Sequence, residues 1–470
     1  NSNPKRGPRR TFGAPRAADV CYAERMKVRS LFCCLLGLAS AVANAETLTI
    51  VQVSKLDSVA MGELVERSGA DFSVEMGSLL VLGGALDPSA WGDLPVSQTM
   101  DVDRERLLLH KRGCGGTGAG IEGRVIASDG NQALIEAPKR FVPYAPPGGE
   151  FRTLKAHNVV LRDTSRDASK APASDPVVQA AVDAVDASRW FSRLSTLASF
   201  DRSSFNDAGS MAARDWLAGQ FNALGYSVTT PSFAVSFSPS NATRQNVLAT
   251  RVGSQFPNQW IVVIGHYDSR NRDIQSPSPA PGAEDNASGC SGVVELADVM
   301  STRNLARSVL FVCVSGEEQG LQGGGDVAQT MMNDGRLANT RLVMNLDMIG
   351  YSADNDFDVV IETEPEFETI LNQFALAAAT YVPDLRVVQD LMPCCSDHMP
   401  FLARGAPGML SIQGDFAQYG AHYHNTTDIP SNITNAQQLG PRILRMNAAV
   451  LAQHLLDRAP SDVLLTNGFE

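Results

Sequence analysis

The sequence predicts a doubly wound α/β domain, with a mostly parallel sheet, helices on both faces and a small β-rich N-terminal module before it. Three observations support this fold. After residue 180, near-continuous apolar runs recur, which is typical of strands buried on both faces of a parallel sheet. Amphipathic helical patterns alternate with these runs. Before residue 161, short stretches instead alternate apolar and polar residues, as half-buried strands do.

The composition is that of a globular protein with more than one domain. The chain has 470 residues, of which 44% are hydrophobic and 19% charged. This is enough apolar material for a large core and too little charge for a disordered chain. The net charge of −12 argues against nucleic-acid binding, because phosphates require a positive protein surface.

The first 45 residues predict export. Met26 precedes two basic residues, an apolar run at 31–42 and Ala43-Asn44-Ala45, which is the pattern of a secretory signal peptide. We therefore expect a signal peptide at 26–45 and a secreted protein, extracellular or periplasmic, after cleavage near Ala45. Residues 1–25 are then an upstream translated segment. The apolar run is too short for a membrane span, so we expect no membrane partner.

Residues 46–161 form the predicted β-rich module. Two short strands flank Asp129-Gly130-Asn131, which indicates a hairpin. Residues 162–178 are polar and rich in Ala, Ser and Pro, which is the composition of a linker. The module follows the signal and carries no candidate site residue. We expect a removable pro-segment that assists folding or covers the site; a partner-binding module is the alternative.

Residues 179–458 carry the α/β pattern. The predicted strands are at 260–264, 309–314, 342–346 and 409–412. Helical spacing predicts helices at 213–224, 293–300, 367–378 and 436–456. Gly225 lies where the first of these helices is expected to end. The tail at 459–470 has no predicted structure.

Imidazole and carboxylate residues follow directly after the predicted strands. The candidate residues are His266, Asp268, Glu317, Glu318, Asp347 and, in a loop after the last strand, His424. Asp285 lies in a Gly/Asn-rich loop before a helix. Taken singly, such residues are most often surface groups or helix caps. Because strand carboxyl ends meet at one edge of an open α/β sheet, we expect these segments to converge on a ligand crevice.

The residue types match those that bind divalent zinc at a catalytic site. His266 and Asp268 are two apart on a strand and point to one side, so Asp268 can accept the second ring N–H of His266. Glu317 and Glu318 are adjacent and diverge, so one can bind metal while the other acts as a general base. Asp285 has two carboxylate oxygens that can bridge two metal ions.

Six motifs occur in a fixed order along the chain: HYDS (266–269), APGAEDNASG (280–289), SGEEQGLQGG (315–324), NLDMIGY (345–351), SDHMPF (396–401) and YHNTTD (423–428). Together they resemble the M28 family of co-catalytic zinc aminopeptidases, and in particular the secreted leucyl-type enzymes of bacteria. The resemblance covers about residues 185–458. Each motif alone is weak, whereas six in this order and spacing are highly specific.

The resemblance implies two zinc ions per catalytic domain. By this resemblance Asp285 bridges the two ions. His266 and Asp347 complete the ligands of one ion, and Glu318 and His424 those of the other.

The same resemblance assigns the remaining roles. Glu317 is the general base, Asp268 is the partner of His266, and Tyr423 matches a tyrosine that stabilises the tetrahedral intermediate in some members. His422 and His398 are competing imidazoles, and His422 is the stronger competitor because it lies two residues before His424.

The implied activity is hydrolysis of the first peptide bond of a peptide or protein with a free N-terminus, by a monomer. A carboxypeptidase or a glutaminyl-cyclase-like relative on the same fold is the close alternative, and a non-catalytic binding protein is the distant one. The motif loops show no obvious Arg cluster for a substrate carboxylate. The related cyclases use one zinc, and binding proteins on this scaffold have usually lost ligands. The complete ligand set favours the two-zinc aminopeptidase.

The cysteines fit an exported protein only loosely. Five follow the signal peptide: Cys114, Cys290, Cys313, Cys394 and Cys395. Cys313 lies in a predicted buried strand, so we expect it to be a free buried thiol. Pairing among the other four is left open. The adjacent Cys394 and Cys395 depart from the family pattern.

Overall fold

The computed structural model describes residues 45–111, 123–129, 132–139, 150–165, 171–203, 206–236, 241–273 and 278–456. The predictions for the upstream segment, for the tail and, except for Ala45, for the signal peptide lie outside these residues, as does Cys114. Among the described helices, none combines the length and the apolar character that crossing a membrane requires.

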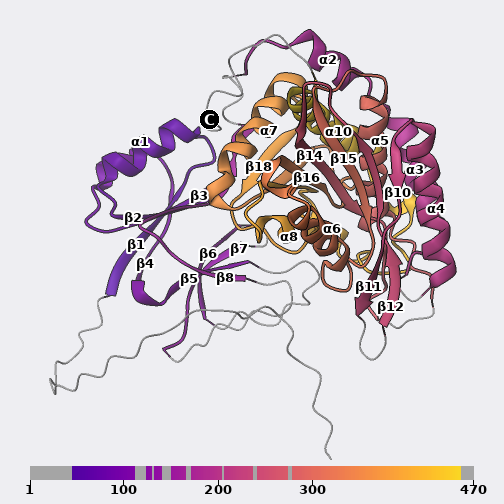
Figure 1. Cartoon of the computed structure of the whole chain (residues 1–470). Helices are drawn as coiled ribbons and strands as arrows, with labels where there is room; N and C mark the ends of the chain where they lie inside the picture. Colours follow the sequence, from indigo (N-terminus) through magenta and orange to yellow (C-terminus); the bar gives the residue numbers. More distant parts are fainter. Residues whose placement is uncertain are drawn as a thin grey trace, which may run out of the picture.

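A mixed sheet of thirteen strands runs through both parts of the molecule (Figure 1). Its order is β10-β13-β15-β14-β16-β19-β17-β18-β9-β2-β3-β1-β4. The central strands are mutually parallel: β14 (Phe256–His266), β15 (Arg307–Val314), β16 (Thr340–Leu346) and β19 (Gly408–Gln413). These are the four strands that the apolar runs predict. Around them lie β10 (Ser227–Thr229), β13 (Val247–Arg251), β17 (Asp358–Glu362) and β18 (Arg386–Asp390).

Helices cover both faces of this sheet, which confirms the doubly wound α/β class. The helices of this part are α2 (Pro176–Asp183), α3 (Ala187–Ala198), α4 (Asp207–Ala223), α5 (Gly289–Ser301), α6 (Gln322–Asn333), α7 (Glu368–Tyr381), α8 (Met399–Leu402), α9 (Phe416–Tyr419) and α10 (Ala436–Leu455). A hairpin of β11 (Ser232–Ser236) and β12 (Asn241–Gln245) stands apart from the sheet. As predicted, α4 ends just before Gly225, whose φ of 81° suits glycine.

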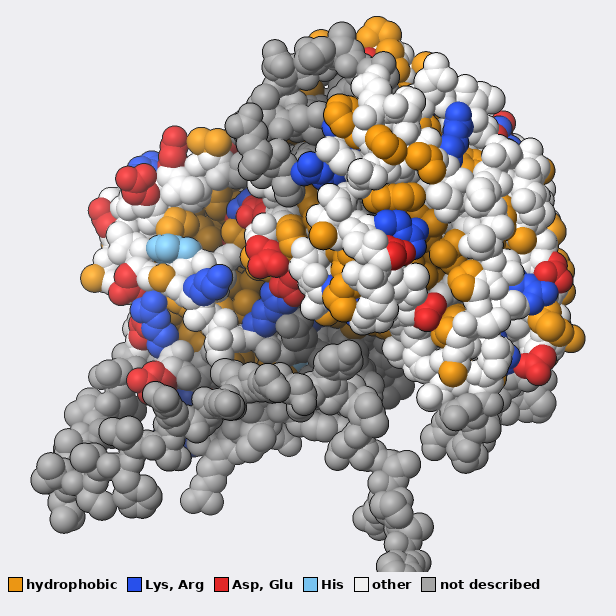
Figure 2. Space-filling model, in the orientation of Figure 1, with side chains coloured by type: hydrophobic (Ala, Val, Ile, Leu, Met, Phe, Trp, Pro, Cys, Tyr) orange, Lys and Arg blue, Asp and Glu red, His pale blue; other side chains and the backbone are white. Residues whose placement is uncertain are grey.

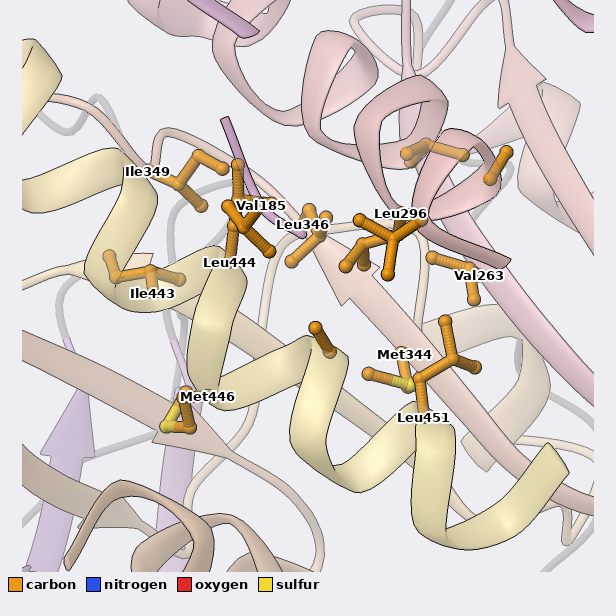
Figure 3. Packing of buried hydrophobic residues seen from close by; sticks show 14 of the residues in the cluster. Val185, Val263, Leu296, Met344, Leu346, Ile349, Ile443, Leu444, Met446 and Leu451 are labelled. Atoms are coloured by element: carbon orange, nitrogen blue, oxygen red, sulfur yellow. The ribbon is translucent and has the colours of Figure 1, made fainter. Parts of the chain in front are cut away.

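The core divides into two layers because successive strand residues point to opposite faces. On one face, Val263 of β14 and Met344 of β16 pack with Leu296 of α5 and Leu451 of α10 (Figure 3). On the other face, Val262 belongs to a second cluster that includes residues of α6 and α8. The central strands are therefore buried on both sides. The carboxyl ends of these strands meet at one edge of the sheet. The candidate site lies at that edge.

The described part of the N-terminal module is β-rich and contains one α-helix, α1 (Ser58–Ser68). Its strands are β1 (Ala45–Gln52), β2 (Phe72–Met76), β3 (Leu79–Gly83), β4 (Val96–Asp103), β5 (Leu107–Lys111), β6 (Arg124–Asp129), β7 (Gln132–Glu136), β8 (Glu150–Thr153) and β9 (His157–Asp163). The antiparallel pairing of β6 with β7 agrees with the predicted hairpin. Strands β6, β7, β5 and β8 form a second sheet.

The module continues the large sheet of the C-terminal part. Strand β9 pairs antiparallel with β18, with Leu161 opposite Asp390, and parallel with β2 on its other side. β9 extends to Asp163 and α2 begins at Pro176, so both ends of the predicted linker at 162–178 lie in regular elements. In Figure 1 the module, drawn in indigo and purple, lies beside β18 and α7.

The prediction of a free thiol at Cys313 is wrong. Cys313 on β15 forms a disulfide with Cys290 on α5, with their Cα atoms 5.9 Å apart. Cys313 on the strand meets a cysteine of the helix that packs over it. The sequence pattern of the strand alone, or of the helix alone, does not reveal such a contact. Cys394 and Cys395 form a second disulfide between adjacent residues.

Candidate metal centre

The first element of the site is the end of β14. His266 is its last residue and is buried, and its Nδ1 lies 3.1 Å from the backbone oxygen of Asp268 and 3.6 Å from Oδ1 of the same residue. The expected pairing is thus present, with the backbone oxygen closer than the carboxylate. The carboxylate of Asp268 also accepts the backbone N–H groups of Glu317 and Glu318, each at 3.3 Å. Asp268 therefore fixes the glutamate pair as well as the histidine.

Asp285 lies between the two imidazoles. Its Oδ1 is 3.3 Å from Nε2 of His266, and its Oδ2 is 3.0 Å from Nε2 of His424. His266 Nε2 is also 3.4 Å from Asp347 Oδ1, and His424 Nε2 is 3.1 Å from Glu318 Oε2. One carboxylate thus faces two histidine–carboxylate pairs, as a bridging ligand must.

The described residues contain two groups with ligand atoms close enough to hold a metal ion. The first consists of His266, Glu317 and Asp347, and the second of Asp285, Glu318 and His424. The structure therefore brings together the candidate residues that the sequence places after separate strands. Glu317 lies with the first group, beside the expected ligands of one ion.

The backbone around Asp285 is held by side chains of other loops. Asp285 lies in η4 (Ala283–Ser288), a π-type turn that leads into α5. The carboxylate of Asp428 accepts the backbone N–H of Glu284 at 2.8 Å and that of Asp285 at 3.1 Å. Asn286 donates to the backbone oxygen of Leu346 at 2.9 Å, which ties the same turn to the end of β16.

Asp347 and His424 have their own supports. Ser396 Oγ donates to Asp347 Oδ2 at 2.6 Å and accepts from Asn345 Nδ2 at 2.7 Å. The ring of Tyr423 stacks on that of His424, with centroids 3.7 Å apart. The tyrosine of the predicted set is therefore beside the site, in contact with a candidate ligand.

Negative charge dominates the site. Burial lowers the pKa of His424, but Glu318 and Asp285 outweigh it and raise this pKa to about 10. In the same way, Asp347 and Glu317 raise the pKa of His266 well above its ordinary value against the effect of burial. Burial raises the pKa of Glu317, and the neighbouring Glu318 adds to this rise. Such a concentration of buried carboxylates favours cations.

The residues fit a divalent metal. Glu318 is buried, and its Oε1 has no hydrogen-bond partner among the described residues. A buried carboxylate oxygen without a donor is costly unless a cation is bound beside it. The imidazole and carboxylate set suits zinc, with Asp285 placed to serve both groups.

The competing imidazoles lie outside both groups. His422 Nδ1 is 3.0 Å from Thr427 Oγ1, in an exposed contact, and His422 belongs to neither group. His398 is buried, and its pKa is lowered to about 3 by burial and by the charge of Lys111. The structure thus places His424, and neither competitor, beside Asp285.

Several supporting residues are missed by sequence reasoning. Asp428 and Ser396 lie inside two of the six motifs. Their positions in the sequence therefore indicate that they lie near the site, although the motifs give neither residue a role. Asp397 is buried beside the site, and burial raises its pKa to about 8. Arg202 is fully buried and donates to the backbone oxygens of Tyr267 and Gly282 at 3.0 and 2.6 Å. No local pattern marks Arg202.

The comparison with protein families decides the identity of this part of the chain. Residues 246–445 match Peptidase family M28. This part of the chain belongs to peptidase family M28. The match spans β13 to the middle of α10 and contains all the candidate residues of the metal centre.

Two curated relatives of the M28 domain come from fungi. The chain is 36% identical over 194 residues to a probable zinc metalloprotease of Pyrenophora teres f. teres, covering 38% of this chain and 40% of the relative. It is 40% identical over 156 residues to a probable zinc metalloprotease of Pyricularia oryzae, covering 30% of each. The chain thus spans about two fifths or less of the length of these relatives.

Solved structures share the fold. An aminopeptidase from Aneurinibacillus sp. strain AM-1 matches with a TM-score of 0.51 and 17% identity, over 62% of this chain and 98% of that one. The LapA aminopeptidase of Legionella pneumophila matches with a TM-score of 0.52 and 17% identity, over 75% of this chain and 99% of that one. At this identity the likeness shows the fold of the M28 domain.

Proposed function

We propose that the chain is a secreted aminopeptidase that binds two zinc ions and removes the first residue of peptides or proteins. The observation that carries this proposal is Asp285, whose two oxygens each face a separate histidine–carboxylate group. His266 and Asp347 would hold one ion, and Glu318 and His424 the other. The family match and the aminopeptidases of similar fold support the choice of chemistry.

Zinc at this site would lower the pKa of a bound water and polarise the substrate carbonyl. The protein supplies the proton transfer. Glu317 lies with His266 and Asp347, and its backbone is fixed by the carboxylate of Asp268. Its role is to take the proton of the attacking water and to pass it to the leaving amine. Tyr423, whose ring stacks on that of His424, would donate to the oxyanion.

An excess of carboxylates also suits the substrate of an aminopeptidase. The free α-amino group carries a positive charge, so it is attracted to a site whose buried side chains are mostly acidic. Internal peptide bonds lack that charge. Selection of the N-terminus thus follows from the charge of the site.

We expect a monomeric enzyme without nucleic-acid or membrane partners. On the face shown in Figure 2, Lys and Arg side chains are scattered among acidic and apolar ones.

Two features support export. The pattern at 26–45 is that of a signal peptide. The disulfides Cys290–Cys313 and Cys394–Cys395 are of the kind that persists in oxidising compartments.

A carboxypeptidase is the second candidate, and one contact favours it. Nε of Arg270 lies 3.9 Å from Oε2 of Glu318, and its side chain is 26% exposed. A guanidinium at this edge of the site can bind a carboxylate of the substrate. The assay must therefore distinguish the two ends of the substrate.

The test is a panel of aminoacyl-anilides and short peptides, each with a free and an acetylated N-terminus, with and without a chelator. We expect cleavage of the free forms only, loss of activity with the chelator and recovery with zinc. Cleavage of acetylated peptides from the C-terminus would establish the carboxypeptidase. No cleavage by the zinc-loaded protein would contradict both.

A further inference from the structure

A fully buried lysine joins the N-terminal module to the M28 domain. Lys111 is the last residue of β5 and has no solvent-exposed area. Its ammonium donates to Glu362 Oε2 and Asp390 Oδ2, both at 2.8 Å, and to the backbone oxygen of Met392 at 2.6 Å. Burial alone lowers the pKa of Lys111, but Asp390 and Glu362 raise it above its ordinary value, so the lysine stays charged.

The two carboxylates lie at strand ends of the M28 domain. Glu362 ends β17 and Asp390 ends β18, and both are buried. Within the described part of the chain, Lys111 is the one cation that forms an ion pair with either. The module therefore supplies the single positive charge that offsets part of the negative charge of these two carboxylates.

The same carboxylates hold the loop that follows β18. Glu362 Oε2 also accepts the backbone N–H of Cys394 at 3.0 Å. Asp390 Oδ1 accepts the backbone N–H of Met392 at 2.7 Å. From the module, Arg152 of β8 donates to the backbone oxygen of Leu391 at 3.0 Å. Residues 391–394 are thus fixed from both parts of the molecule.

This loop leads directly to the metal centre. Ser396, two residues beyond Cys394, donates to Asp347 Oδ2 at 2.6 Å. Asp347 is a candidate ligand with His266. A continuous series of contacts therefore runs from Lys111 through Glu362 and the loop to Asp347.

We propose that Lys111 is a positioning residue of the metal centre, which makes the N-terminal module a working part of the enzyme. Acting through Glu362 and residues 391–396, Lys111 sets Ser396 against Asp347. The proposal rests on the proposed function in one respect, namely that the centre binds zinc. It is opposed to the pro-segment interpretation, which stays a prediction, because a discarded module would take Lys111 with it.

Loss of the Lys111 ammonium would act first on its two carboxylate partners. Glu362 and Asp390 would be two buried carboxylates with no cation, so one must take up a proton or the loop must move to admit water. Either change alters the acceptors of the Cys394 and Met392 N–H groups. The hydrogen bond of a ligating carboxylate typically accounts for about 10- to 100-fold in metal affinity or activity. We expect an effect of that size on the ion bound by Asp347.

The test compares two variants of the full chain. Lys111→Met removes the ammonium. Arg162→Met is the matched control, because Arg162 on β9 also joins the two parts, through Glu75 of the module and Glu368 of α7, but is not hydrogen-bonded to the loop. Zinc affinity is measured by competition with a chelator, and thermal unfolding shows that each variant is folded. We expect Lys111→Met to bind one zinc ion about 10- to 100-fold more weakly and Arg162→Met to bind as the wild type does.

Each outcome has one meaning. If the wild type binds no zinc, the proposed function fails. If the wild type binds zinc and folded Lys111→Met binds it equally well, the positioning role is overturned. If Lys111→Met does not fold, Ser396→Ala replaces it, because that variant cuts the last contact and leaves the lysine cluster intact. Weakened zinc binding by Ser396→Ala supports the proposal, and unchanged binding overturns it.

Discussion

Two groups of buried carboxylates lie at strand ends of the M28 domain, and they differ in how their charge is balanced. At the ends of β17 and β18, Glu362 and Asp390 both form ion pairs with Lys111 of the N-terminal module. At the metal centre the acidic residues outnumber the two imidazoles, and Nε of Arg270 lies 3.9 Å from Oε2 of Glu318.

The difference shows what makes a strand-end cluster functional. In the cluster of Lys111, both carboxylates contact the ammonium and all three side chains are buried, so this closed cluster holds the chain and is not open to ligands. A cluster in which Glu318 Oε1 has no donor among the described residues favours an added cation. The two clusters are linked by the loop from Asp390 to Ser396, so the closed one supports the open one.

Among the changes at the metal centre, Glu317→Gln should have the largest effect. The amide keeps the shape of the side chain but cannot accept the proton of water. We expect turnover to fall by about 10²–10⁴-fold with both zinc ions retained. The measurement is kcat together with metal content. Glu366→Gln, an exposed change in the same domain, is the control and should leave both unchanged. Near wild-type turnover would remove Glu317 from the role of base.

Lys111→Met tests the cluster of Lys111, Glu362 and Asp390 through its effect on the free energy of unfolding. Breaking a buried ion pair while leaving its partners in place costs about 3–5 kcal/mol of the free energy of unfolding. Chemical denaturation should show a loss of this size. Adding Glu362→Gln should recover part of it, because one of the uncompensated charges is then gone. If Lys111→Met alone is as stable as the wild type, the buried ion pairs of Lys111 do not hold the chain together.

Asp268→Asn should have a smaller effect on the metal side. The backbone N–H groups of Glu317 and Glu318 bond different oxygens of Asp268, and the amide replaces one of these oxygens with an NH2 donor, so one N–H group loses its acceptor. We expect activity to fall by about 10- to 100-fold, as for other groups that orient ligands. The loss should appear in kcat more than in KM. A loss confined to KM would indicate a direct contact of Asp268 with substrate.

Substitution of Asp358 should have the smallest effect of these changes, because Arg386 balances the charge of Asp358 only in part. Burial raises the pKa of Asp358 to about 6, and Asp415 adds to this rise while Arg386 opposes it. The folded state therefore binds the proton more tightly than the unfolded one. The free energy of unfolding should decrease as pH rises from about 4 to 6 and then stay level. Asp358→Asn should reduce this slope and stabilise the protein at pH 7 by roughly 1 kcal/mol. An unchanged slope would contradict the assignment.

The sequence predicts the parts of this protein that are set by local pattern. The four central strands appear as apolar runs, and the candidate ligands follow because polar residues at strand ends lie at one edge of a parallel sheet. The separation of Glu317 and Glu318 into two groups follows from their adjacency.

Long-range contacts could not be predicted in the same way. Lys111 ends a short apolar strand of the module, and nothing near it in the sequence indicates partners at Glu362 and Asp390. The pairing of β9 with β18 joins segments far apart in the chain. The Cys290–Cys313 disulfide likewise depends on packing of α5 over β15, so the local strand pattern around Cys313 gave the wrong result.

Metal analysis tests the central claim most directly. The protein is stripped with a chelator, refilled with zinc, freed of unbound metal and analysed for zinc per chain. Because Asp285 faces two separate histidine–carboxylate groups, we predict about two equivalents, falling towards one or none in Asp285→Ala. A plateau at one equivalent in the wild type would contradict the shared carboxylate and favour a cyclase-like relative, and no bound zinc would contradict the account of the metal centre.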